Sequence, residues 1–152
     1  MIKRFICMLI LITLGVSMNT KFSELNQCFG ASKNVVIYND GIQHNVSVEE
    51  QIDIVNAMNT MLNNSHEMPA FGVSLDHETR EELKKGTWIE FSFGTTQYYN
   101  DMPFDSLLIK VVAEDMGFNI IRKHDGIYDG RCYYISLNNN MSILSEAIES
   151  FI

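Results

Sequence analysis

Between residues 87 and 137 the apolar residues fall into short runs separated by turn-forming residues. Each run is rich in aromatic and β-branched side chains and is bounded by Gly, Asn, Asp or Pro, which is typical of β-strands. The four expected strands are residues 88–93, 107–112, 118–121 and 132–137. Because short turns join neighbouring strands, we expect an antiparallel meander over 87–137.

A small hairpin is predicted closer to the N-terminus. Residues 34–38 are a β-branched and aromatic run, and residues 42–46 are its expected returning strand. Asn39, Asp40 and Gly41 lie between them, and these residue types tolerate the positive φ angles of a tight turn. Residues 71–75 are expected to form a short strand or an extended connection.

Two long helices are predicted, over about 47–63 and 141–151. Ser47 and Glu50 have the spacing of a capping box, which marks the start of the first helix. Apolar residues recur every three to four positions in both helices, so each should bury one stripe. The first stripe is expected to contain Val48, Ile52, Val55, Met58 or Met61, and Leu62, and the second Met141, Leu144, Ile148 and Phe151.

The sheet and the helices together predict an α+β domain over residues 34–152. Ile89, Phe91 and Phe93 share one face of the first strand, which is the natural packing surface for both long helices. A shorter helix is expected over 77–85, capped by Asp76 and ended by Gly86. The expected architecture is therefore two layers, a mainly antiparallel sheet covered by two long helices.

The first eighteen residues are distinct from the rest. Lys3 and Arg4 precede an uncharged apolar run from residue 5 to residue 18. Fourteen residues span about 21 Å as a helix, which is short of the roughly 30 Å hydrocarbon core of a bilayer. We therefore expect residues 1–18 to be a signal peptide of a secreted or cell-surface protein, and the alternative is an uncleaved membrane anchor. Residues 19–33 are polar and aperiodic and are predicted to be a linker.

The charge of the chain is strongly negative. The sequence has eleven basic and nineteen acidic residues, and all the acidic ones lie beyond residue 18. Without Lys3 and Arg4 nine basic residues remain, so the net charge is about −10. Such a field repels phosphate backbones, and nucleic acid is not expected as a partner. The acidity serves solubility or provides a docking face for a basic partner.

Two cysteines remain after the apolar run, Cys28 and Cys132. In an oxidising compartment they could form a disulfide that ties the linker to the last strand. Alternatively, Cys132 is a small buried apolar residue and Cys28 is a free thiol.

The sequence contains no motif for a metal, a cofactor or a catalytic centre. The four histidines have no helical ligand spacing, and there is no Cys-x-x-Cys or phosphate-binding glycine pattern. A nucleophilic Cys132 paired with His124, His77 or His44, or an Asp/His pair, is the hypothesis for a secreted hydrolase. No cofactor or metal is predicted.

The second sheet face offers a candidate binding surface. Trp88, Lys110 and Tyr134 would share it, and Tyr98 and Tyr99 could extend it. Aromatic rings mixed with polar groups stack on sugars or anchor protein partners. The alternative is that the lead-in or helix 77–85 covers Trp88 and Tyr134. From the sequence we expect a small exported, non-catalytic domain that binds a protein or a cell-envelope glycan.

Overall fold

The computed structural model describes residues 20–68, 72–112, 117–128, 130–138 and 141–152. The predicted signal peptide lies outside these residues. Within the described part no helix is long and apolar enough to cross a membrane. In chain order, the elements are β1 (Thr20–Phe22), α1 (Leu25–Gly30), β2 (Asn34–Asn39), β3 (Ile42–Asn45), α2 (Val48–Asn63), β4 (Ser65–Met68), β5 (Val73–Ser74), α3 (Asp76–Glu82), β6 (Thr87–Tyr99), β7 (Met102–Val111), β8 (Phe118–His124), β9 (Ile127–Tyr128), β10 (Gly130–Arg131), β11 (Tyr133–Leu137), α4 (Ser142–Ala147) and the 3₁₀ turn η1 (Glu149–Phe151).

The fold is a mixed α+β domain built on a mostly antiparallel sheet. The main path of the sheet runs β3-β2-β6-β7-β8-β11-β4, with β9 added beside β8. Strand β1 pairs with the far end of β6 in parallel, and within the described residues the other strand pairs of this sheet are antiparallel. Strands β5 and β10 form a separate two-stranded ribbon. The predicted succession of four antiparallel strands is confirmed as β6, β7, β8 and β11, with the short strands β9 and β10 between the last two in sequence.

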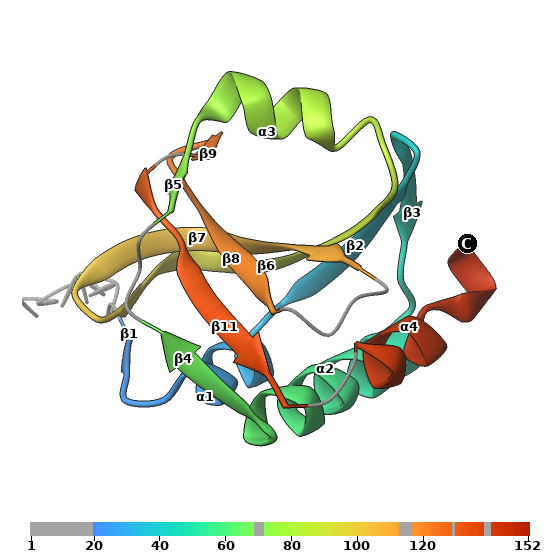
Figure 1. Cartoon of the computed structure of the whole chain (residues 1–152), viewed down its shortest axis with the longest axis horizontal. Helices are drawn as coiled ribbons and strands as arrows, with labels where there is room; N and C mark the ends of the chain where they lie inside the picture. Colours follow the sequence, from blue (N-terminus) through green and yellow to red (C-terminus); the bar gives the residue numbers. More distant parts are fainter. Residues whose placement is uncertain (1–19, 69–71, 113–116, 129, 139–140) are drawn as a thin grey trace, which may run out of the picture.

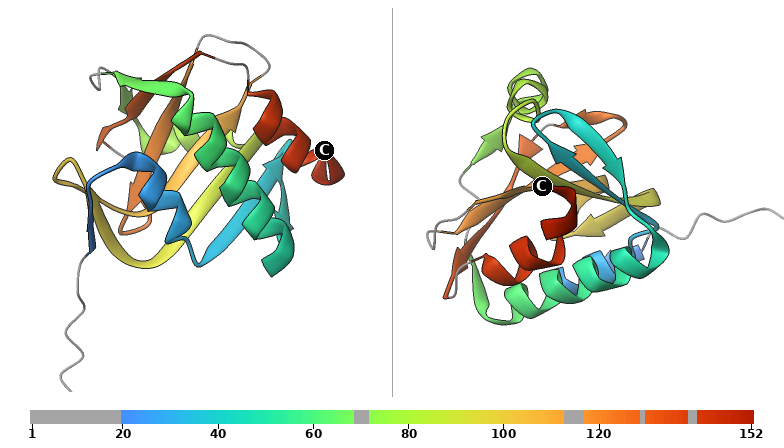
Figure 2. Two further views of the ribbon diagram at one scale, coloured as in Figure 1. Left: turned by 90° about the horizontal axis from the view of Figure 1, so that it is seen from below. Right: turned by 90° about the vertical axis from the view of Figure 1, so that its right-hand side faces the viewer.

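Helices lie on both faces of this sheet. Figure 1 shows α1, α2 and α4 below the sheet and α3 above it, and the right-hand view of Figure 2 gives the same arrangement from the side. The lower face holds the larger apolar core, to which the sheet contributes Ile89, Phe91 and Ile120. A second, smaller cluster of Trp88, Leu108 and Tyr128 lies on the α3 side.

The β2–β3 turn and the start of α2 form where the local sequence predicts them. Asp40 and Gly41 make the β2–β3 turn with positive φ angles of 47° and 81°. The Ser47 side chain accepts a hydrogen bond from the Glu50 amide, and the Glu50 carboxylate accepts one from the Ser47 amide, which completes the capping box of α2. These interactions involve residues close in sequence, so they do not depend on the rest of the fold.

The prediction of a second long helix over about 141–151 is wrong. Helix α4 has six residues, and the chain then tightens into η1 because Phe151 donates its amide hydrogen to the Ile148 carbonyl. Short 3₁₀ turns are frequent at helix C-termini. Here the break still allows Ile148 to be fully buried and sets Phe151 edge-on to His44 of β3. Packing against the sheet edge thus took precedence over a continuous helix.

The predicted linker, residues 19–33, contains β1 and α1. Leu25, Cys28 and Phe29 of α1 are buried in the core below the sheet, and the Phe29 ring lies edge-on to Phe91 at a centroid distance of 4.8 Å. Three apolar residues in one short turn are too few for a recognisable helical period, which is why the sequence pattern indicated a linker.

The loop expected between the first two meander strands is also mostly strand. Strand β6 continues to Tyr99 and β7 begins at Met102, with an irregular register between Ser92 and Gln97. Asn100 and Asp101 form the tip, with φ angles of 49° and 58°.

Helix α2 buries only the second half of the predicted stripe: Met58 and Met61 are buried, and Val55 and Leu62 pack partly buried against the core. Its buried residues are Ile54, Ala57, Met58 and Met61, whereas Val48 is 77% and Ile52 55% exposed. The sequence of α2 has two overlapping apolar rows, and only contact with the sheet and α4 selects between them.

Replacing Met58 and Ile52 separately by alanine tests which side of α2 faces the core. Met58→Ala should lower the free energy of unfolding by about 3 kcal/mol because it leaves a cavity in the core. Ile52→Ala should change it by less than about 1 kcal/mol because most of that side chain already contacts water. Urea denaturation followed by circular dichroism measures both, and equal losses would contradict the observed orientation of α2.

Candidate functional site

The five residues of the predicted binding face do not share one exposed surface. Trp88 is 4% and Tyr99 7% exposed, while Tyr98, Lys110 and Tyr134 are half-buried. Tyr99 belongs to the core below the sheet, and its hydroxyl donates to Glu67. Trp88 belongs to the cluster under α3. Trp88 is therefore covered on the α3 side of the sheet, which agrees with the alternative in which helix 77–85 covers it.

Trp88 is held in place by the end of α3. Its indole nitrogen donates to the Glu82 carbonyl at 3.2 Å and to the Lys85 carbonyl at 3.0 Å. The Lys110 ammonium lies over the Trp88 ring, 5.1 Å from the ring centroid. The indole is thus part of the packing between α3 and the sheet.

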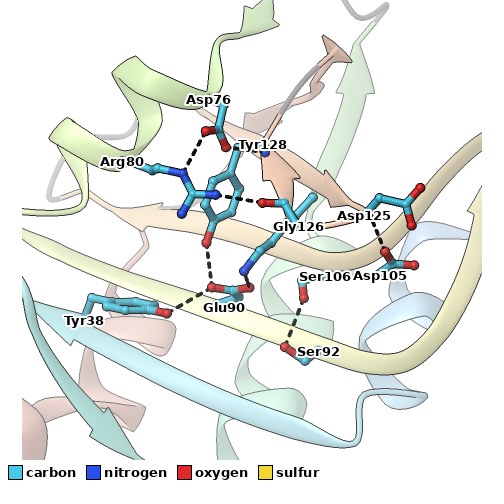
Figure 3. Close-up of polar contacts among 11 residues, drawn as sticks. Tyr38, Asp76, Arg80, Glu90, Ser92, Asp105, Ser106, Asp125, Gly126 and Tyr128 are labelled. Atoms are coloured by element: carbon cyan, nitrogen blue, oxygen red, sulfur yellow. Dashed lines mark hydrogen bonds and ion pairs between the residues drawn. The ribbon is translucent and has the colours of Figure 1, made fainter.

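Beside Trp88, a buried carboxylate organises the same face of the sheet. Glu90 of β6 is 3% exposed. It accepts hydrogen bonds from Tyr128 at 2.7 Å, from Lys123 at 2.9 Å and from Tyr38 at 3.1 Å. Figure 3 shows the two tyrosine hydroxyls pointing at the Glu90 carboxylate. Burial alone would favour the protonated acid, but these three donors outweigh it, so the pKa of Glu90 lies below its usual value. Burial and the nearby Glu90 carboxylate raise the pKa of Tyr38 to about 12.

Helix α3 is tied to this network through Tyr128. Asp76, the first residue of α3, accepts the Tyr128 amide at 2.9 Å and the Arg80 guanidinium at 2.8 Å. Arg80 also donates to the Gly126 carbonyl at 2.7 Å and lies 5.4 Å from the centre of the Tyr128 ring. Asp76 was predicted to cap α3, and instead its side chain binds the helix to β9 (Figure 3).

Between α3 and the sheet lies a cavity of about 190 Å³, here called the α3 cleft. Trp88 and Ile121 of the sheet line it, and α3 contributes Glu78, Thr79 and Glu82. Residues 72–75, which lead into α3, together with Asn119 of β8 and Cys132, complete its border. Within this border Val73 is 67% and Leu75 51% exposed, so apolar side chains face solvent at a concave surface.

The two cysteines are free thiols, so the predicted disulfide is not present in this structure. Cys28 is buried in the core below the sheet, whereas Cys132 borders the α3 cleft on the opposite side. Burial raises the pKa of Cys28 to about 12 and also raises the pKa of Cys132. Both thiols therefore stay protonated at neutral pH, which is unfavourable for a nucleophile.

An Asp/His pair does form, at the turn between β8 and β9. His124 Nδ1 lies 3.2 Å from Asp105, and Asp105 also accepts the Asp125 amide at 2.7 Å and the Thr96 hydroxyl at 2.8 Å. The other imidazole nitrogen lies 3.7 Å from the Asp125 carboxylate. No hydrogen bond between His124 and a hydroxyl or thiol is recorded within the described residues. Ser92 and Ser106, the nearby serines of Figure 3, hydrogen-bond each other at 3.0 Å.

The side chains of Asp105, His124 and Asp125 place their potential ligand atoms within 4.8 Å of one another. Within the described residues, this is the group whose spacing would allow a metal ion to bind. Sequence reasoning noticed His124 beside Asp125 but missed Asp105, because β7 brings it there from nineteen residues away. The signal that could have found it is the predicted pairing of the two strands.

Comparison of this chain with protein-family models, with curated proteins and with solved structures found no match. Its function is therefore inferred from its own geometry.

Glu90→Gln should lower the free energy of unfolding and should make that free energy less dependent on pH. In the unfolded chain Glu90 takes up a proton near its ordinary pKa of 4.5, whereas the folded protein resists protonation, so its contribution is complete above that pH and is lost as the pH falls. The substitution leaves Lys123 without its carboxylate, and we expect a loss of about 2 kcal/mol at neutral pH.

Urea unfolding of wild type and variant between acidic and neutral pH measures this loss, and the difference should shrink toward acidic pH. Glu81→Gln is the matched control, because the Glu81–Lys84 pair is exposed and should change stability by less than about 0.5 kcal/mol. Equal losses in the two variants would show that Glu90 is no more important than a surface carboxylate.

Thiol labelling tests the state of the cysteines. In the folded protein near neutral pH both Cys28 and Cys132 should react with a disulfide reagent at least about 100-fold more slowly than in urea, because both are buried and protonated. Mass spectrometry of the labelled peptides reads each site separately. Rapid labelling of Cys132 alone would favour the hydrolase hypothesis, and a bond between the two cysteines would contradict the structure.

Proposed function

We propose that this chain is a small exported domain that acts by binding, and that the α3 cleft receives an apolar side chain from a basic segment of a partner protein. Export is carried by residues 1–18 of the sequence. The observation that carries the binding site is a concave, partly apolar surface with Trp88 in its wall and exposed Val73 and Leu75 at its border.

The size of the cleft favours one anchoring side chain over a whole small molecule. Its volume of about 190 Å³ is below the range of roughly 300–1,000 Å³ that is typical of small-molecule sites. Protein interfaces, by contrast, concentrate their affinity in a few buried anchors that fill pockets of this kind.

The polar groups of the cleft are poorly suited to a sugar. The hydroxyls of Ser74 and Thr79 hydrogen-bond each other at 2.6 Å, so this buried pair is already satisfied. Trp88 uses its indole hydrogen on α3 and shows little of its ring to solvent. A protein segment needs neither group, which is why we prefer it to the glycan that the sequence also allowed.

The charge around the cleft favours a basic partner. Glu78 and Glu82 line it from α3, and Glu78 is exposed. The whole chain is acidic, so its field attracts a cationic segment over a longer range. Such charges mainly accelerate association and select the partner, and apolar contact in the cleft supplies the affinity.

A binding assay with synthetic peptides tests the proposal, since Trp88 is the only tryptophan of the chain and reports on the cleft by fluorescence. A lysine-rich peptide with a central leucine should bind the full chain and change the Trp88 emission. Peptides with alanine at the centre, or with glutamates in place of lysines, should bind about tenfold more weakly.

The matched variants are Leu75→Ser and Val48→Ser. Leu75 is the N-cap residue of α3, where serine is favourable, so this change removes the apolar border without weakening the helix. Val48 is an exposed apolar residue of α2 on the other side of the sheet. Binding should fall only in Leu75→Ser. An unchanged Trp88 signal, or equal losses in both variants, would reject the cleft as the site.

A further inference from the structure

A second cavity, of about 330 Å³, lies on the opposite side of the sheet from the α3 cleft. It is formed where α1, the C-terminal end of α2 and β4 meet, and Figures 1 and 2 show these three elements side by side. Its volume falls within the range of small-molecule sites. The cavity is independent of the α3 cleft and shares no lining residue with it.

The lining of this cavity combines hydrogen-bonding side chains with an apolar floor. Asn26, Asn63 and Ser65 offer carboxamide and hydroxyl groups, and Glu24 and Glu67 offer carboxylates. The floor includes the buried side chains of Leu25, Tyr99 and Ile135. Such a mixture recognises ligands that have hydroxyls at the edges and C–H groups on a face.

Two of the polar groups are already oriented. Glu67 accepts hydrogen bonds from the Tyr99 hydroxyl and, at 3.1 Å, from the Asn100 side chain, so its carboxylate is held by fixed donors. Asn26 donates to Asn63 at 3.1 Å, which links α1 to the end of α2. Orientation before binding lowers the entropic cost of holding a ligand.

Asn26 also has an unsatisfied acceptor. Its side-chain oxygen is buried and has no hydrogen-bond donor among the described residues. A buried acceptor without a donor is unfavourable, and because this oxygen has almost no exposed surface, a ligand hydroxyl in the adjoining cavity reaches it only when the side chain rotates. This observation is independent of the shape of the cavity and indicates a ligand with O–H or N–H donors.

The charges of the cavity exclude an anion. Glu24 and Glu67 are carboxylates, and the lining contains no lysine or arginine. A phosphate, a uronic acid or another anionic group would be repelled. We propose that this cavity binds a neutral saccharide unit, with Asn26, Asn63 and Glu67 hydrogen-bonding its hydroxyls and Leu25 and Leu62 contacting its apolar face.

Titration of the full chain with sugars, followed by ¹H–¹⁵N NMR, tests this proposal. D-glucose and N-acetyl-D-glucosamine should shift the amide signals around Asn26 and Asn63 saturably at millimolar concentrations, and D-glucuronate should bind at least about tenfold more weakly because of its charge. The disaccharide N,N′-diacetylchitobiose distinguishes two sources of the ligand. A site for the end of a glycan binds it at least as tightly as the monosaccharide, and a site for a free sugar binds it more weakly.

Asn63→Ala should weaken the binding of the neutral sugars about tenfold, and Asn56→Ala should leave it unchanged. Both residues are exposed on α2, but only Asn63 borders the cavity, so the pair separates a local effect from a general one. Failure of every sugar to saturate, an equal response of the two variants, or stronger binding of glucuronate would overturn the proposal. Binding of the lysine-rich peptide should be the same in both variants, so this test is separate from that of the α3 cleft.

Discussion

The position of α3 over the sheet depends on the buried carboxylate of Glu90. A carboxylate away from water is costly unless hydrogen bonds or a cation compensate for the lost hydration. Here the three donors come from three different strands, Tyr38 of β2, Lys123 of β8 and Tyr128 of β9. The network therefore forms only when the strands around β6 are correctly placed.

Tyr128 carries this constraint to α3. Its hydroxyl binds Glu90, its backbone amide binds Asp76, and its ring contacts the Arg80 and Lys123 side chains. A seven-residue helix has little stability of its own, so it depends on these contacts and on Trp88 at its other end. The α3 cleft is lined by Glu78, Thr79 and Glu82 of this helix, so its shape depends on the same contacts.

Charge is distributed differently on the two sides of the sheet. The helical elements α1, α2, α4 and η1 contain five acidic residues and no basic one. On the α3 side, Arg80, Lys84, Lys110 and Lys123 are each paired with a carboxylate. Under the proposed function, this acidity would attract a basic partner over a long range, and apolar contact would hold it at the α3 cleft. The cavity beside α1 has two carboxylates and no basic residue in its lining, so it is unsuited to an anion.

The sequence by itself determined the features whose causes lie within a few residues. The turn at Asp40 and Gly41, the capping box of Ser47 and Glu50, and the alternation of β6 depend on backbone preferences and on neighbours in the chain. Only the tertiary structure decided which row of α2 is buried, that residues 20–33 join the core, that Trp88 is covered, and that Cys28 and Cys132 lie on opposite sides of the sheet. These outcomes depend on contacts between segments far apart in sequence, and an apolar pattern shows that a side chain can be buried but not which surface will cover it.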